Sequence, residues 1–140
     1  MSPLFTRIAV LLVISVATWL AVIVGRNIIE SQRRRALSAA PLLSGGVANA
    51  AVRILVFSSA DCRQCHTMQA PAVQRVLAAR GDVVSAEEID APNTPELAER
   101  YHVMTVPTTV VLDSAGRAHA VNYGFTSTVK LLTQIDALLQ

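Results

Sequence analysis

The stretch RILVFSSADCRQC, residues 53–65, decides the fold. Its first part, Arg53–Ser58, is a short and nearly all-apolar run with β-branched side chains, a pattern typical of a strand buried on both faces of a sheet. We therefore expect a central strand here. The two cysteines of the chain, Cys62 and Cys65, follow three residues apart at the predicted start of a helix. Such close cysteines form a local pair rather than a disulfide framework between distant segments.

The rest of the chain alternates between helix and strand patterns. Apolar spacing and turn residues predict helices over 67–80, 94–101 and 126–139, and strands over 83–89, 108–112 and 117–123. With the first strand, the order is βαβαββα. Strands separated by helices are expected to pair in parallel, and the last two to form an antiparallel hairpin. The sequence thus predicts an α/β fold with a mixed sheet flanked by helices.

Three residues add detail to the predicted helices. Pro71 lies inside the first helix, where it is expected to bend the backbone because it has no N–H to donate. Thr94 and Pro95 are residue types favoured at the N-cap and at the first position of a helix. The second helix is therefore expected to begin there.

The composition excludes several classes of protein. With 52% apolar and 16% charged residues, the chain is too apolar for a disordered or wholly soluble protein. A net charge of +2 and 4% aromatic residues offer little to nucleic acid, so no nucleic-acid partner is expected. Residues 1–51 carry five Arg and one Glu, whereas residues 52–140 carry seven basic and nine acidic groups. The excess positive charge therefore belongs to the N-terminal third.

Residues 8–25 contain no charged side chain and lie between Arg7 and Arg26. As a helix they would reach about 27 Å, close to the hydrocarbon thickness of a bilayer. We predict a transmembrane anchor over residues 1–27 that contacts the lipid bilayer through residues 8–25. A cleaved signal peptide is the alternative, but the small residues 48–50 lie more than twenty residues past the apolar run.

The arginines around this segment predict its orientation. Arg7 precedes it, whereas Arg26 and residues 33–35, all arginine, follow it. Basic residues near a membrane segment tend to remain cytoplasmic, so we expect a single-pass cell-membrane protein whose C-terminal domain faces the cytoplasm, with the extracytoplasmic side as the alternative. Residues 28–51 are predicted to be a basic juxtamembrane segment and a linker, rich in Ala, Ser and Gly from Ala36 onward. The folded domain is then 52–140.

The position of the cysteine pair predicts its chemistry. Free amide groups and the positive end of the dipole at a helix start favour a thiolate, so Cys62 is expected to have a lowered pKa and to act as the nucleophile. Cys65, one turn further, is expected to resolve a mixed disulfide formed on Cys62. Arg63 should support the thiolate, whereas Asp61 should oppose it.

Further motifs agree with this chemistry. Residues 105–108 read Thr-Val-Pro-Thr before a strand, and the last hairpin is followed by Gly124 and an amphipathic helix. With the cysteine pair, these features make residues 52–140 resemble a thioredoxin-fold thiol–disulfide oxidoreductase. The resemblance implies that Pro107 is cis and faces the disulfide, and that the backbone of Val106 pairs with an extended substrate peptide. The simpler alternative is that Pro107 merely starts a strand.

The sequence also departs from that family. Asp61 stands where thioredoxins proper carry tryptophan, and the family's buried acid and its lysine partner correspond to Val56 and Ala86. Glu87 or Glu88 is available as a substitute proton acceptor, although solvent-facing carboxylates on a strand are the more common explanation of such a pair.

Two other functions use the same residues. Cys62 and Cys65 followed by His66 also spell the attachment pattern of a c-type haem, with Met68 or Met104 as a second axial ligand. The two thiolates with two imidazoles would complete a zinc site, for which the sequence provides His66, His102 and His119. We expect neither group, and no other cofactor or metal.

The function that the sequence favours is a membrane-tethered thiol–disulfide oxidoreductase acting as a protein-disulfide reductase. Its expected substrates are disulfide-containing proteins or small thiols. A reductase, or a transmembrane electron donor if the domain faces outward, is expected to recharge the dithiol.

Overall fold

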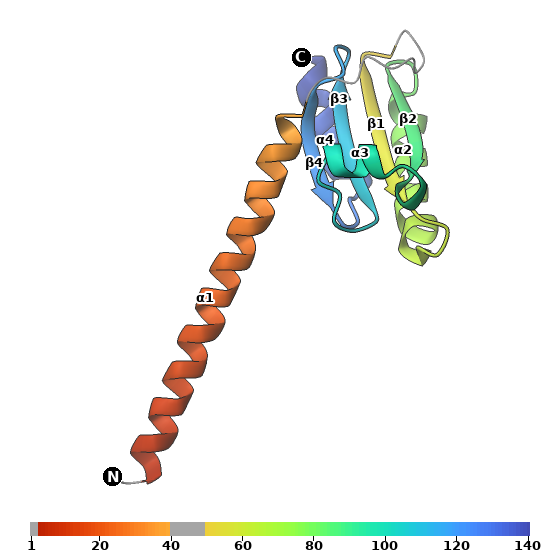
Figure 1. The fold of residues 1–140 in the computed structure, drawn as a ribbon. Helices are drawn as coiled ribbons and strands as arrows, with labels where there is room; N and C mark the ends of the chain where they lie inside the picture. The colour runs from red at the N-terminus through yellow and green to blue at the C-terminus, as the bar shows by residue number, and fades with distance from the viewer. Residues whose placement is uncertain (1–2, 40–49) are drawn as a thin grey trace. The chain divides into compact units, whose positions relative to one another are not determined.

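The computed structural model describes residues 3–39 and 50–140 (Figure 1). The chain divides into two compact units, residues 1–32 and 33–140. Residues 40–49 of the predicted juxtamembrane segment and linker lie outside the described residues.

Helix α1 spans Pro3–Leu37. By length and composition it is able to cross a membrane, a property that signal sequences share. Its 35 residues correspond to about 52 Å, more than the roughly 30 Å of a hydrocarbon core. The helix therefore continues well past the apolar run and includes the three consecutive arginines.

Four strands form one sheet in the order β2-β1-β3-β4. Strand β1 spans Val52–Ser58, β2 Val84–Asp90, β3 Thr108–Asp113 and β4 Ala118–Tyr123. Strand β1 is parallel to β2 and antiparallel to β3, which is antiparallel to β4. The mixed sheet and the central position of the first strand are confirmed.

The direction of β3 differs from the prediction, because β3 runs antiparallel to the first two strands. Helix α3, Pro95–Arg100, connects β2 to β3 together with a 3₁₀ turn over Ala91–Asn93. Six helical residues reach only about 9 Å, whereas a seven-residue strand extends about 23 Å. The helix is too short to return the chain along the sheet, so β3 starts at the edge where β2 ends.

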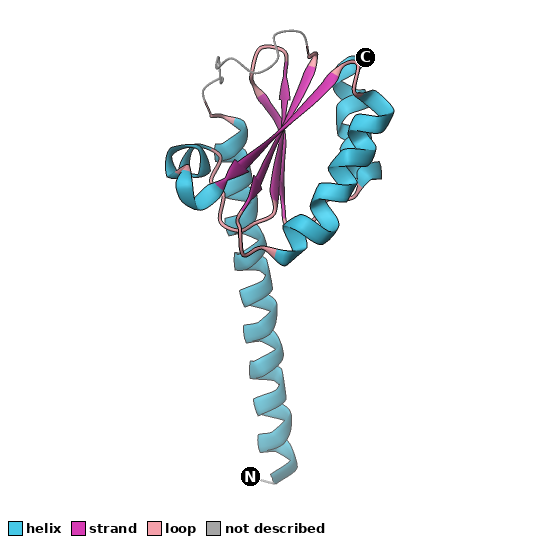
Figure 2. Ribbon diagram, turned by 90° about the vertical axis from the view of Figure 1, so that its right-hand side faces the viewer, coloured by secondary structure: helices cyan, strands magenta, loops and turns pink. Residues whose placement is uncertain are grey.

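Helices cover both faces of the sheet (Figure 2). Helices α2, Ala70–Arg80, and α4, Thr128–Leu139, pack on one face, which we call the α2/α4 face. Helix α3 lies on the other, the α3 face. The core of the α2/α4 face contains Val52, Ile54, Val56, Val73, Val76, Val84, Val111, Ala120, Leu131 and Ile135. The core of the α3 face contains Ala36, Leu55, Phe57, Ile89, Tyr101, Val110, Leu112 and Val121.

The end of α1 contributes to the α3 face within the unit of residues 33–140. Ala36 is fully buried, and Leu37 and Ala39 pack against the same core. Burial raises the pKa of Tyr123, and the charge of Arg33 acts on the same group in the opposite direction. Residues 36–39 were expected to belong to the tether, but apolar contacts with the sheet place them in the folded unit.

Two helix starts differ in detail from the predictions. Thr94 precedes α3 as expected, but its side chain accepts no capping hydrogen bond. Helix α4 begins at Thr128 rather than at residue 126, because Ser127 is the N-cap and its hydroxyl accepts the amide of Lys130.

Asp113 organises the hairpin between β3 and β4. Its Oδ1 accepts the backbone amides of Ala115 and Arg117, both at 2.9 Å. Its Oδ2 accepts Nε of Arg117 at 3.1 Å and lies 2.9 Å from Nε2 of His119. Desolvation acts to raise the pKa of Asp113, but these hydrogen bonds outweigh it and lower the pKa from 3.8 to about 2.

We expect Asp113→Asn to destabilise the fold at neutral pH by about 1 kcal/mol, the scale of a charge-assisted hydrogen bond partly screened by solvent. Because the folded-state pKa lies below the unfolded value, this stabilisation is present above about pH 4 and is lost as the pH falls through about 2. Urea unfolding of the full-length protein in detergent micelles at several pH values measures the difference. The exposed Asp82→Asn is the control, and a gap between wild type and Asp113→Asn that stays constant down to pH 2 would contradict the assignment.

Candidate functional site

The site lies at the edge of the sheet where β1 ends. Phe57, near the end of β1, pairs with Thr108 at the start of β3, and Thr108 pairs with Tyr123 at the end of β4. The segments that follow β1, precede β3 and follow β4 therefore meet at one edge. These segments carry the cysteine pair, Pro107 and Gly124.

Cys62 and Cys65 form a disulfide at the start of the helical segment that leads into α2. The backbone N–H of Cys65 donates to Sγ of Cys62 at 3.1 Å. Cys65 is 3% exposed, whereas Cys62 is half-buried. An amide at a helix start that points at sulfur stabilises a thiolate, and only the sulfur that a partner reaches is able to attack it. Both features favour Cys62 as the attacking sulfur.

A π-helical turn over Cys65–Gln69 joins this start to α2. The amide of Ala70 donates to the carbonyl of Cys65, five residues back. Pro71 cannot donate a hydrogen bond to the carbonyl four residues before it, so a regular α-helical pattern is interrupted here. The sequence predicted a bend at Pro71, and the structure has a widened turn shortly before it, beginning at Cys65.

The residues that flank Cys62 are exposed. Asp61 and Arg63, predicted to shift the pKa of Cys62 in opposite directions, both reach solvent. His66, which the haem and zinc alternatives required as a ligand, lies with Nε2 3.3 Å from the carbonyl oxygen of Ala60. In residues 3–39 and 50–140, no three His, Cys, Asp or Glu side chains gather as metal ligands do.

The peptide bond between Val106 and Pro107 is cis, as the resemblance implied. Pro107 is buried, and its carbonyl accepts the amide of Gly124 at 2.8 Å. Thr108 donates its hydroxyl to the carbonyl of Thr105 at 2.7 Å. The segment before β3 is therefore fixed to the segment after β4 at the edge that carries the disulfide.

Gln69 is a site residue that sequence reasoning missed. It is fully buried, its Oε1 accepts the amide of Thr126 at 2.8 Å, and its Nε2 donates to the carbonyl of Thr126 at 3.2 Å. Thr128 adds a hydrogen bond from its hydroxyl to the carbonyl of Ala72 at 3.1 Å. These contacts fix the loop after β4 to the helix that carries the cysteines. The available signal was a glutamine at helical spacing from Val73 and Val76, on the face that is otherwise apolar.

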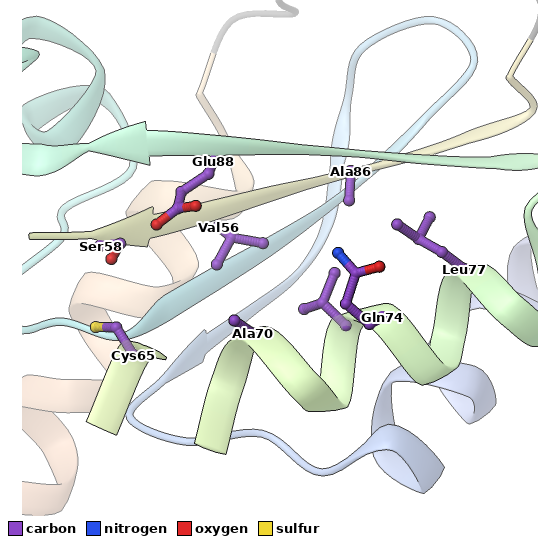
Figure 3. Close-up of a pocket in the computed structure, with 9 residues that line it drawn as sticks. Val56, Ser58, Cys65, Ala70, Gln74, Leu77, Ala86 and Glu88 are labelled. Atoms are coloured by element: carbon purple, nitrogen blue, oxygen red, sulfur yellow. The ribbon is translucent and has the colours of Figure 1, made fainter. Parts of the chain in front are cut away.

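A cavity of about 110 Å³ lies behind Cys65 (Figure 3). It is lined by Val56, Ser58, Cys65, Ala70, Val73, Gln74, Leu77, Ala86 and Glu88. A more open hollow of about 340 Å³ adjoins it and shares Ser58 and Glu88 with it. The two positions where the family would carry its acid and its lysine, Val56 and Ala86, are part of the cavity wall.

The sequence of residues 52–123, just over half of the chain, matches the thioredoxin domain family. The chain belongs to this family, and with its paired cysteines it is a thiol–disulfide oxidoreductase. A search of curated proteins found no match.

Solved structures agree with this assignment. The germline-specific thioredoxin Deadhead of Drosophila melanogaster is 26% identical with a TM-score of 0.57, over 65% of this chain and 84% of that one. A thioredoxin variant of Halobacterium salinarum is 25% identical with a TM-score of 0.58, over 66% and 79%. A thioredoxin-2 described as a component of the malaria parasite's protein secretion machinery is 20% identical with a TM-score of 0.61, over 71% and 94%, and supports the fold alone.

We expect Gln69→Leu to destabilise the protein by about 1–3 kcal/mol, because it leaves two buried backbone groups of Thr126 without partners. Thermal or urea unfolding of the full-length protein in micelles measures this loss. Gln74→Leu is the matched control, since Gln74 is exposed on α2. Equal stability of the two variants would show that the contacts with Thr126 contribute nothing.

Proposed function

We propose that the chain is a single-pass, membrane-tethered protein-disulfide reductase that works through Cys62 and Cys65. The observation that carries the proposal is the amide of Cys65 donating to Sγ of Cys62 while Cys65 itself is buried. This arrangement gives the two sulfurs different tasks. The accessible sulfur of Cys62 attacks the substrate, and the buried sulfur of Cys65 reacts only after a mixed disulfide has formed on Cys62.

The reaction consumes a dithiol and a substrate disulfide. The thiolate of Cys62 attacks one substrate sulfur, forms a mixed disulfide and releases the other substrate sulfur as a thiolate, which takes up a proton from solvent. The thiol of Cys65 then attacks Sγ of Cys62, loses its proton and releases the second substrate thiol. Two electrons have passed to the substrate, and the disulfide between Cys62 and Cys65 remains. A separate reductase or electron donor returns it to the dithiol.

Residues around the disulfide provide the substrate contacts. Val106 and Pro107 lie at the same edge of the sheet as Cys62, which supports a role for the backbone of Val106 in pairing with an extended segment of a substrate protein. Arg63 supports the thiolate of Cys62 and Asp61 opposes it. Disulfide-containing proteins, and small disulfides that reach Cys62, are the substrates.

The N-terminal helix holds this activity at the membrane. Residues 8–25 contact the lipid bilayer, and Arg26 with the arginines at 33–35 favours a cytoplasmic domain. Thiols are kept reduced in that compartment, which favours disulfide reduction over oxidation.

Replacing Cys65 with Ser should trap the mixed disulfide on Cys62, because no resolving thiol remains. Non-reducing electrophoresis of membranes from cells under oxidative challenge should show adducts that disappear on reduction. The Cys62→Ser protein is the control and should carry far fewer adducts. Absence of adducts from Cys65→Ser under these conditions would argue against the mechanism.

The side of the membrane is tested separately with reporters fused after Gln140. A reporter active only in the cytoplasm should be active, and one active only outside the membrane should be silent. The reverse pattern would place the domain outside and assign recharging to a transmembrane electron donor. A soluble, N-terminally shortened protein would instead identify a cleaved signal sequence.

A further inference from the structure

The buried position of Cys65 creates a requirement for proton transfer. Cys65 is 3% exposed, and in the second step of the reaction its thiol must lose a proton as it attacks. A free thiol ionises near pH 8.5, so at neutral pH an acceptor accelerates this step. Such an acceptor must be reachable from Cys65, and Cys65 forms part of the wall of the cavity described above.

The cavity is able to hold water. Its volume of about 110 Å³ exceeds the roughly 10–15 Å³ that a single water needs. Ser58 is 3% exposed, and its Oγ has no hydrogen-bond partner among the described residues. A buried hydroxyl without a partner costs about 1–3 kcal/mol, which a water in the cavity would offset. The hydroxyl of Ser58 therefore offers a hydrogen-bond partner to a water in this cavity.

Glu88 is the carboxylate in the wall of this cavity. Apart from Cys65, the other residues that line the cavity have apolar or uncharged polar side chains that do not accept a proton at neutral pH. Glu88 is also exposed and lines the adjoining open hollow with His66 and Asp90, so a proton that reaches it has a route to solvent. In the view of Figure 3, the hydroxyl of Ser58 lies between the carboxylate of Glu88 and the sulfur of Cys65.

The register of the sheet separates Glu88 from its neighbour. Glu88 pairs with Val56, which belongs to the core of the α2/α4 face, whereas Glu87 pairs with Leu55, which belongs to the core of the α3 face. Adjacent strand residues point to opposite faces of a sheet. The two glutamates therefore have the same charge and neighbouring positions but lie on opposite faces.

We propose that Glu88 accepts the proton of Cys65 across the cavity, through water held by Ser58. The proposal rests on the reductase function above and concerns its second step. As Sγ of Cys65 bonds to Sγ of Cys62, the bond between Cys62 and the substrate sulfur breaks. The proton of Cys65 passes through water to Glu88 and then to solvent, and the substrate sulfur leaves with the electron pair.

The two steps are separated by dithiobis(nitrobenzoate), an aromatic disulfide that releases a coloured thiolate at each step. Reduced full-length protein in detergent micelles is mixed with the reagent in a stopped-flow instrument. The first release reports attack by Cys62, and the second reports attack by Cys65. Cys65→Ser should show only the first release.

Glu88→Gln should leave the first release unchanged and slow the second by about tenfold or more at neutral pH, since a positioned general base contributes on this scale or above. Ser58→Ala should slow the same phase. Glu87→Gln is the matched control and should behave as wild type in both phases. A second phase at the wild-type rate in either Glu88→Gln or Ser58→Ala overturns the proposed route.

The pH dependence distinguishes proton transfer from a structural effect. The deficit of Glu88→Gln should be largest near neutral pH and should close above about pH 9, where a free thiol loses its proton unaided. His66 and Asp90 in the adjoining hollow, and Asp61 and Arg63 beside Cys62, are present in every variant and affect all of them alike. A deficit that persists equally at high pH would indicate distortion of the site and would also overturn the proposal.

Failure of this proposal is distinguishable from failure of the proposed function. If wild type shows two releases and Glu88→Gln matches it at every pH, the reductase chemistry stands and only the route of the proton is wrong. If wild type shows a single release, Cys65 does not resolve the mixed disulfide, and the two-cysteine mechanism itself is wrong.

Discussion

Strand β1 is buried on both faces, with Val56 in the core of the α2/α4 face and Phe57 in that of the α3 face. A shift of one residue would exchange every side chain of the strand between the two cores, so the register of β1 is strongly fixed. This constraint determines where the chain leaves the sheet after Ser58. The helix start that carries the two cysteines is therefore held at the edge of the sheet where β3 begins and β4 ends.

The backbone around the cysteines gives the two sulfurs different environments: Sγ of Cys62 accepts a hydrogen bond, whereas Cys65 is buried. The amide of Cys65 donates to Sγ of Cys62, and the π-turn that accommodates Pro71 follows at once. Gln69 ends this turn and binds both backbone groups of Thr126, so the helix start and the loop after β4 support each other. A polar side chain buried at this point stabilises the geometry because both of its hydrogen-bonding groups are satisfied.

The core of the α3 face includes residues that precede β1, so the folded unit begins before that strand. Ala36, at the end of the long N-terminal helix, is buried among the side chains of the α3 face. The same short segment contains the arginines that predict membrane orientation. One stretch of sequence thus carries both the charge pattern on which the predicted orientation depends and an apolar residue that completes a core.

The sequence by itself determined the features that depend on local patterns: the buried strand before Cys62, the order of the elements, the interruption at Pro71 and, through resemblance, the cis bond at Pro107. Only the tertiary structure decided the direction of β3, the contacts of Gln69 and which of Glu87 and Glu88 lines the cavity beside Cys65. Periodicity reports which residues of an element are buried, but not against which partner. Strand direction and register arise from contacts between segments distant in the chain, and a single sequence contains no local signal for them.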